Sequence, residues 1–139
     1  ALAASLDVSL PYPVLEMDRA ALPPAEGSYP LTRADMDWFS QLYLRSPADA
    51  ADPLCSVGRA ADLRALPPTL LIQARHDLLF PEGLTFAARL ASAGVPLVHR
   101  IHRSLPHAFS AMTGALPTAR AAMIETAELT GAALRADTP

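Results

Sequence analysis

The sequence predicts an α/β fold in which mainly parallel strands are flanked by helices. A short apolar run, Thr69–Gln73, and a second predicted strand, Val95–Ile101, support this prediction, and a segment with helical periodicity separates them. A continuous apolar run is typical of a strand that is covered on both faces, as in parallel sheets. A strand–helix–strand unit of this length places its two strands side by side and parallel, with a right-handed crossover. The length of 139 residues allows one domain with one core.

The composition is that of a globular protein and excludes several function classes. Hydrophobic residues make up 51% of the chain, and the formal net charge is −3. All 11 basic residues are Arg and they are scattered, so no basic patch indicates a nucleic-acid partner. The absence of Lys and Asn is what a GC-rich bacterial gene would produce. The single cysteine, Cys55, excludes a disulfide framework and is expected to be a small buried or half-buried residue.

The sequence contains no targeting or membrane segment. No apolar run is long enough to cross a bilayer, and no basic start leads into an apolar core with a cleavage site. We therefore expect no membrane span and a cytoplasmic location. A removed leader stays open as an alternative, because the N-terminus resembles the interior of a longer chain.

In the first half, one strand and one helix are predicted between two loops. Leu6–Leu15 reads as a strand that ends at its prolines, since proline fits poorly inside a central strand. Thr32 is a good N-cap for a helix that runs to about Leu44, and Asp35 completes a weak capping box. Apolar residues recur on this helix at helical spacing: Met36, Phe39, Leu42 and Tyr43. The loops cover residues 18–30 and 46–62.

In the second half, two helices are predicted, one before and one after the strand Val95–Ile101. Pro81 begins the first of them, and Gly94 ends it as a C-terminal cap. Its expected buried stripe consists of Leu84, Ala87, Leu90 and Ala91. Glu82 is expected to favour the start of this helix by charge–dipole attraction. A last helix is predicted over about Pro117–Ala136, weakened near Gly131.

Two residues with useful chemistry follow the two predicted parallel strands. Asp77 comes after the strand Leu70–Ala74, and His107 follows the strand Leu97–Ile101 after a loop that contains proline. Ligands of open α/β sheets bind outside the carboxyl ends of the strands, so both side chains are expected at one rim. A carboxylate that accepts the imidazole N–H fixes the tautomer and stabilises the imidazolium. Spacing alone leaves the alternatives open, because an Asp after a strand is often a helix cap and a loop His is often only solvated.

The sequence motifs around these residues resemble the signature of the hormone-sensitive-lipase-like esterases. That family has "LPP", an apolar strand, "D-P-L-x-D-E-G" and a helix of the type "Y-A-x-x-L-x-x-A-G-V-P", and the stretch 66–96 is similar to it. The family's "H-G-F" is matched by His107-Ala108-Phe109, and its "Y-P-V-L-D" by residues 12–15. Its "Y-x-L-T-R-x-x-M-x-W-F" is matched by residues 29–39. These matches fall in order along nearly the whole chain.

The resemblance implies an α/β-hydrolase fold, a Ser-Asp-His triad and hydrolysis of small-molecule carboxylic esters without a cofactor. It assigns the triad acid to Asp77 and the triad base to His107 in the unit 67–107. It also implies that the helix within 31–45 lies at the cap or acyl pocket, with Trp38 and Phe39 in contact with substrate. Phe109 is expected as a pocket wall. Ordinary helix packing is the alternative for Trp38 and Phe39, and packing beneath the pocket is the alternative for Phe109.

The sequence departs from this family at the nucleophile. Neither the Gly-x-Ser-x-Gly elbow nor the His-Gly-Gly-Gly turn of the oxyanion hole occurs in the 139 residues. We therefore expect the C-terminal portion of an α/β-hydrolase whose N-terminal half, with the nucleophile elbow, is absent. An N-terminal complementing segment or self-association is the expected partner. The alternatives are a non-catalytic binding or assembly remnant and a related biosynthetic enzyme of this fold that acts on another bond.

Two smaller features complete the expectations. Ala108 stands where the family has Gly, which matters if the backbone φ is positive there. Three further histidines suggest a metal site, but zinc requires three or four converging ligands and their positions do not converge: His76, His99 and His102. No metal site is expected.

Overall fold

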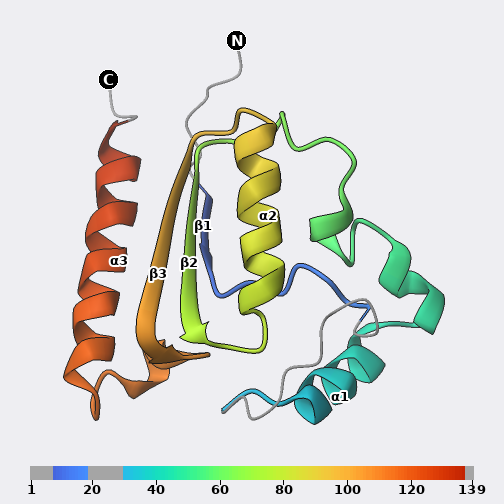
Figure 1. Ribbon diagram of the computed structural model, residues 1–139, viewed down its shortest axis with the longest axis horizontal. Helices are drawn as coiled ribbons and strands as arrows, with labels where there is room; N and C mark the ends of the chain where they lie inside the picture. The colour runs from blue at the N-terminus through green and yellow to red at the C-terminus, as the bar shows by residue number, and fades with distance from the viewer. Residues whose placement is uncertain (1–7, 19–29, 137–139) are drawn as a thin grey trace.

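The computed structural model describes residues 8–18 and 30–136 and contains a parallel three-stranded sheet. Both neighbouring pairs are parallel, and the strand order equals the order in the sequence (Figure 1). The predicted α/β architecture is therefore confirmed. The strands are β1 (Val8–Pro11), β2 (Thr69–His76) and β3 (Leu97–Pro106).

Helices cover both faces of this sheet. Helix α2 (Phe80–Ser92) packs on one face, and α3 (Pro117–Ala136) packs on the other (Figure 1). Helix α1 (Arg33–Tyr43) lies off the sheet, beside the carboxyl ends of the strands. Three short 3-10 helices complete the described elements: η2 (Pro47–Ala51), η3 (Val57–Arg59) and η4 (Phe109–Met112). Two of these occupy the segment 46–62 that the sequence predicts as a loop.

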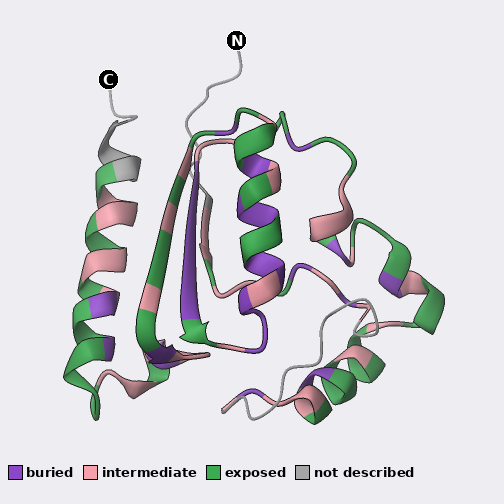
Figure 2. Cartoon of the chain, viewed as in Figure 1, coloured by how far each residue is buried: buried purple, intermediate pink, exposed green. Residues whose placement is uncertain are grey.

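The central strand β2 forms the core of the molecule. Its first six residues are buried, as expected for a strand with neighbours on both edges and helices on both faces (Figure 2). On the α3 side, Leu70, Ile72 and Ala74 pack with Phe109 and two alanines of the helix. The other face carries a second apolar cluster: Leu15, Leu63, Phe86, Leu90 and Val95. Asp77 thus follows a strand whose first six residues are buried in the core.

The buried face of α2 differs from the predicted stripe. Ala87 and Leu90 are buried as expected, but Leu84 is 41% exposed and Ala91 is also exposed. The remaining buried positions of this helix are Phe80, Glu82, Gly83 and Phe86. The prediction was wrong because Gly83 faces the sheet. A glycine adds nothing to an apolar pattern, yet a Cβ there would lie 2.0 Å from Nε2 of Gln73.

Element boundaries also differ from the sequence-based expectations. Strand β1 ends at Pro11, so residues 12–15 continue outside it, and β3 starts at Leu97 and runs on to Pro106 instead of Ile101. His107 therefore follows β3 directly, without an intervening loop. The capped start of α1 at Thr32, the end of α2 just before Gly94 (φ 74°) and the last helix are confirmed. The predicted strand residues Leu6 and Asp7 and most of the loop 18–30 lie outside the described residues. Within the described ranges, no helix is long and apolar enough to cross a membrane.

Candidate active site at the carboxyl end of the sheet

Asp77 directly follows β2, and both of its carboxylate oxygens accept hydrogen bonds. Oδ1 accepts the backbone N–H of Leu79 at 2.9 Å, which closes a local turn before α2. Oδ2 lies 2.8 Å from Nδ1 of His107. The Asp77 side chain is 2% exposed. The orientation of the Asp77 carboxylate is therefore set locally, by a turn between a buried strand and a helix.

His107 presents its imidazole to Asp77 from the end of β3. Because the Asp77 carboxylate can only accept, Nδ1 of His107 carries the hydrogen of this bond. The other ring nitrogen, Nε2, is then the one left for proton transfer. The His107 side chain is 18% exposed, so a reactant can reach the ring. The two residues that the sequence places at one rim are brought together here across two adjacent parallel strands.

The residue after His107 has a left-handed backbone. Ala108 has φ 53° and ψ 29° and precedes η4. This is the position at which the resembling family has glycine, which adopts such angles without a steric cost. The backbone of the turn after His107 therefore has the left-handed conformation that favours glycine, although Ala108 carries a methyl group.

Tyr12 is a neighbour of His107 that sequence reasoning did not single out for the site. The two ring centroids lie 4.9 Å apart with an interplanar angle of 61°. The Tyr12 hydroxyl shares a hydrogen bond of 2.6 Å with Oγ of Ser110. The residue lies just after β1 and has φ 36°. The matched "Y-P-V-L" motif contains Tyr12 and could have drawn attention to it. The motif does not show, however, that the side chain contacts His107.

An apolar pocket of about 690 Å³ lies beside His107. Phe39 of α1 lines it, whereas Trp38 is 56% exposed and does not, and contact of Phe39 with a substrate stays a prediction. Phe109 is 1% exposed and lies beneath the rim, edge-on to Tyr12 at 5.4 Å, so it is not a wall of this pocket. Cys55 is half-buried in the lining. The remaining lining residues are Val14, Met17, Leu31, Met36, Leu42, Tyr43, Leu54 and Val57.

Buried polar groups hold the backbone of the pocket wall in place. Oε1 of Glu82, on α2, accepts the N–H of Leu15 at 2.7 Å, and Glu82 is only 6% exposed. The N–H of Met17 donates to Oγ of Ser56, which is fully buried. Gly58 N–H donates to the carbonyl of Leu15 at 2.7 Å. The expected charge–dipole role of Glu82 thus gives only part of its function, because the side chain reaches across to the segment after β1.

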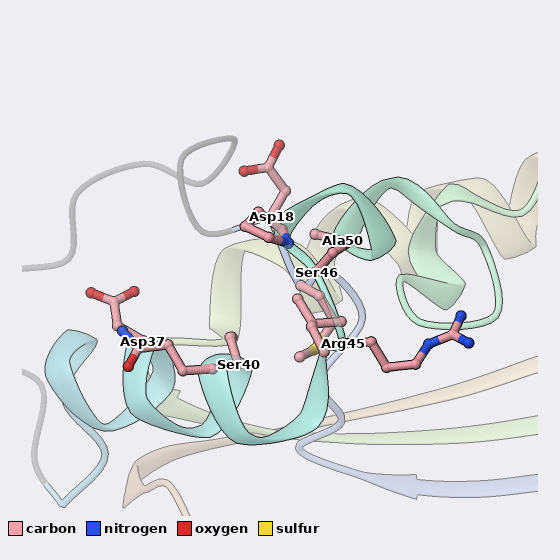
Figure 3. A pocket seen from close by; sticks show the side chains of 10 residues that line it. Asp18, Asp37, Ser40, Arg45, Ser46 and Ala50 are labelled. Atoms are coloured by element: carbon pink, nitrogen blue, oxygen red, sulfur yellow. The ribbon is translucent and has the colours of Figure 1, made fainter.

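A second hollow of about 500 Å³ lies between α1 and η2 (Figure 3), and Met17 lines both this hollow and the apolar pocket. Its charged side chains are paired with near neighbours. Asp37 lies 3.3 Å from Arg33, and Arg45 lies 3.5 Å from Asp49 while extending into solvent. This hollow therefore offers no converging set of groups for chemistry.

Two of the remaining histidines, His99 and His102, have structural contacts, whereas His76 is exposed at the end of β2. Nε2 of His99 lies 2.7 Å from Oε1 of Gln73, and burial lowers the pKa of His99 below its ordinary value. The pKa of His102 is lowered mainly by burial, and its ring packs edge-on against Phe109 at 5.2 Å. No group of three or more potential metal ligands is found in the described part of the chain.

Comparison with known proteins identifies the family to which this arrangement belongs. The profile of the alpha/beta hydrolase fold family matches residues 6–111, which include β1, β2, α2, β3 and the Asp77–His107 pair. The chain belongs to the α/β-hydrolase fold family. The resemblance to hormone-sensitive-lipase-like esterases that the motifs indicate is confirmed at the level of the family.

Several relatives of this α/β-hydrolase chain are named as ester hydrolases. It is 42% identical over 80 residues to the carboxylic ester hydrolase LipN of Mycobacterium tuberculosis, which covers 57% of this chain and 21% of LipN. It is 31% identical over 105 residues to the ethyl acetate hydrolase of Pseudomonas putida, covering 73% of this chain and 32% of that enzyme. The chain thus spans about a fifth to a third of the length of these curated relatives.

A solved structure places the same α/β-hydrolase fold in an esterase. The carboxylesterase EstE1, cloned from a metagenomic library, superimposes with a TM-score of 0.83 at 28% identity. The match covers 96% of this chain and 46% of EstE1. The described elements are therefore arranged as in somewhat less than half of a complete esterase.

Proposed function

We propose that this chain supplies the acid and the base of a carboxylic ester hydrolase. The observation that carries the proposal is the 2.8 Å contact between Oδ2 of Asp77 and Nδ1 of His107, at the edge of an apolar pocket. An imidazole held in this way can take a proton from a nucleophile and return it to a leaving group. The named activities of the relatives, carboxylic ester and ethyl acetate hydrolysis, support the same reaction class.

In the proposed reaction, a serine hydroxyl attacks the ester carbonyl carbon. Nε2 of His107 takes the hydroxyl proton, and Asp77 stabilises the imidazolium through Nδ1. When the tetrahedral intermediate breaks down, the imidazolium gives its proton to the leaving alcohol, and an acyl-enzyme remains. Water then attacks the acyl group, with His107 again as base, and releases the carboxylic acid and the serine.

The pocket favours esters with an apolar acyl or alcohol portion. Besides His107, its lining is almost entirely apolar and comes from α1, residues 14–17 and residues 54–57. A volume of about 690 Å³ suits a small to medium ligand, because pockets for such ligands fall within roughly 300–1,000 Å³. Charged substrates would lose their hydration without gaining a partner in this lining.

The proposed nucleophile comes from a polypeptide segment other than these 139 residues. None of the serines in the sequence stands in a Gly-x-Ser-x-Gly context. Within the described residues, the buried Ser56 is engaged by Met17 N–H and the Ala50 carbonyl, which leaves it unsuited to attack. A complementing N-terminal segment, which would add a strand along the β1 edge, is consistent with the 46% coverage of EstE1.

The test is an intact-mass measurement combined with a p-nitrophenyl butyrate assay on the same purified material. Ester turnover together with a second polypeptide, or a mass larger than 14.7 kDa, supports the proposal if His107→Ala abolishes it. His76→Gln is the matched control, because His76 is an exposed imidazole at the end of β2. Turnover that survives His107→Ala would overturn the assignment.

A non-catalytic binding or assembly module is the second candidate function. The absence of a nucleophile elbow from the 139 residues favours it, and so do the exposed apolar side chains of α1, such as Leu42 (67%) and Tyr43 (65%). A single species of this mass that binds a partner chain but hydrolyses no ester would support it.

A further inference from the structure

Tyr12 contacts the His107 turn at two separate points. Its ring lies edge-on to the imidazole, with the centroids 4.9 Å apart. Its hydroxyl shares a 2.6 Å hydrogen bond with Oγ of Ser110, three positions beyond His107. The same ring also lies edge-on to Phe109 at 5.4 Å. A residue from the exit of β1 therefore contacts His107, Phe109 and Ser110 in succession.

Backbone strain concentrates around the same imidazole. Among the described residues, Tyr12 and Ala108 are the non-glycine positions with positive φ, at 36° and 53°. Residues with a Cβ rarely adopt this region, and they remain there only where surrounding contacts hold them. Tyr12 is held by its N–H, which donates to the carbonyl of Ile72 at 2.7 Å. One strained residue contacts the His107 ring, and the other follows His107 in the chain.

We propose that Tyr12 is a positioning residue for His107. The bond to Asp77 fixes the imidazole at Nδ1 only, and rotation about that bond would still change the direction of Nε2. The edge-on Tyr12 ring limits this rotation, and the Tyr12–Ser110 bond holds the turn from which the imidazole projects. Small errors in the aim of a catalytic group lower the rate because the reacting atoms are no longer aligned. The inference rests on the proposed function in that it treats His107 as the base.

Simple core packing is the competing explanation for Tyr12. The ring does contact the apolar cluster around Ile72 and Phe109. Packing alone, however, needs only the ring and not the hydroxyl. Tyr12→Phe keeps the ring and removes the hydroxyl, and Ser110→Ala removes the same hydrogen bond from the other side. The two variants therefore separate positioning from packing.

The experiment measures two quantities in the protein that carries this chain. The first is the low-field NMR resonance of the Nδ1 proton of His107, assigned by its loss in His107→Gln. The second is kcat and KM for p-nitrophenyl butyrate. The variants are Tyr12→Phe, Ser110→Ala and the double variant, and the matched control is Ser92→Ala, which removes an exposed hydroxyl on α2.

In Tyr12→Phe and in Ser110→Ala we expect the Nδ1 resonance to shift or broaden and kcat to fall about threefold to tenfold at unchanged KM. The double variant should be no worse than either single variant, because all three lose the same bond. Wild-type resonance and kcat in both single variants would overturn the inference. A changed resonance in a protein without any ester turnover would support Tyr12 as a positioning residue while counting against the proposed reaction.

Discussion

The buried carboxylate of Glu82 accepts the backbone N–H of Leu15 at 2.7 Å, which ties helix α2 to the segment after β1. Glu82 also lies in the first turn of α2, which itself follows the Asp77 turn. One side chain thus links the wall of the apolar pocket to the helix next to the proposed triad acid. Removal of the Glu82 carboxylate should therefore destabilise both the pocket wall and the start of α2.

Glu82→Ala is expected to lower the free energy of unfolding by about 1.5–3 kcal/mol, because a buried N–H loses a charged acceptor. Glu82→Gln keeps an acceptor oxygen and should lose less. Denaturant unfolding followed by circular dichroism measures both changes. Glu128→Ala, an exposed Glu on α3, is the control and should change stability by less than about 0.5 kcal/mol. Equal effects of Glu82→Ala and Glu128→Ala would contradict the importance of this link.

Gly83→Ala is expected to destabilise the fold by about 1–3 kcal/mol through overpacking. The new Cβ would lie 2.0 Å from Nε2 of Gln73. The Gln73 amide cannot move freely, because its Nε2 donates a hydrogen bond to the carbonyl of Phe80 and its Oε1 is hydrogen-bonded to Nε2 of His99. Gly114→Ala is the matched control, since nothing lies within 4 Å of its Cβ. Equal melting temperatures for Gly83→Ala and Gly114→Ala would contradict the close packing of Gly83 against Gln73.

Ala108→Gly should stabilise the protein. A left-handed residue with a Cβ carries a cost of about 1–2 kcal/mol, which glycine avoids. Glycine also makes the unfolded chain more flexible, which offsets about 0.4–1 kcal/mol of the gain. We expect a net increase of about 0.5–1 kcal/mol, measured as a higher Tm. Ala121→Gly, an exposed position in α3, should have the opposite sign because glycine weakens a helix interior. A lower Tm for Ala108→Gly would show that the turn does not favour glycine.

Stability should decrease on acidification partly through His99. Burial holds its pKa in the fold below the ordinary value of 6.5, so the unfolded chain binds more protons as the pH falls through that value. The contribution of neutral His99 is therefore complete above about pH 6.5 and is lost as the pH falls toward the lower pKa of the folded state. His99→Gln should lose less stability than wild type between about pH 7.5 and 5.5. Part of the slope should persist in His99→Gln, because the pKa of His102 is lowered by burial in the same direction.

Much of the arrangement follows from short-range patterns in the sequence. The run Thr69–Gln73 marks β2 because its three central residues are all apolar, and Gly94 marks the end of α2 because its φ of 74° suits glycine. Asp77 and His107 were placed at one rim by the rule that adjacent parallel strands end together, and their side chains lie 2.8 Å apart. Their catalytic roles stay a proposal that activity measurements must test.

The features that the sequence did not predict depend on long-range contacts. The positive φ of Tyr12 has no signature in the sequence, and its hydrogen-bond partners Ile72 and Ser110 come from distant positions. The sequence gives no reason to expect that the polar side chain of Glu82 is buried. Only the fold shows that it accepts a hydrogen bond from the buried N–H of Leu15. The exposure of Trp38 next to the pocket-lining Phe39 depends on how α1 is rotated, which helical periodicity alone does not fix.

The most direct test of the account is the kcat for p-nitrophenyl butyrate hydrolysis by Asp77→Asn. An Asn can still accept the Leu79 N–H, but its amide group would face Nδ1 of His107 and favour the wrong tautomer. Asp62→Asn, at an exposed carboxylate bonded to Arg64, is the control and should behave like wild type. We predict that kcat falls by about 10³–10⁴ in Asp77→Asn while the protein stays folded. A folded Asp77→Asn protein with kcat within about tenfold of wild type would contradict Asp77 and His107 as the acid and base of the enzyme.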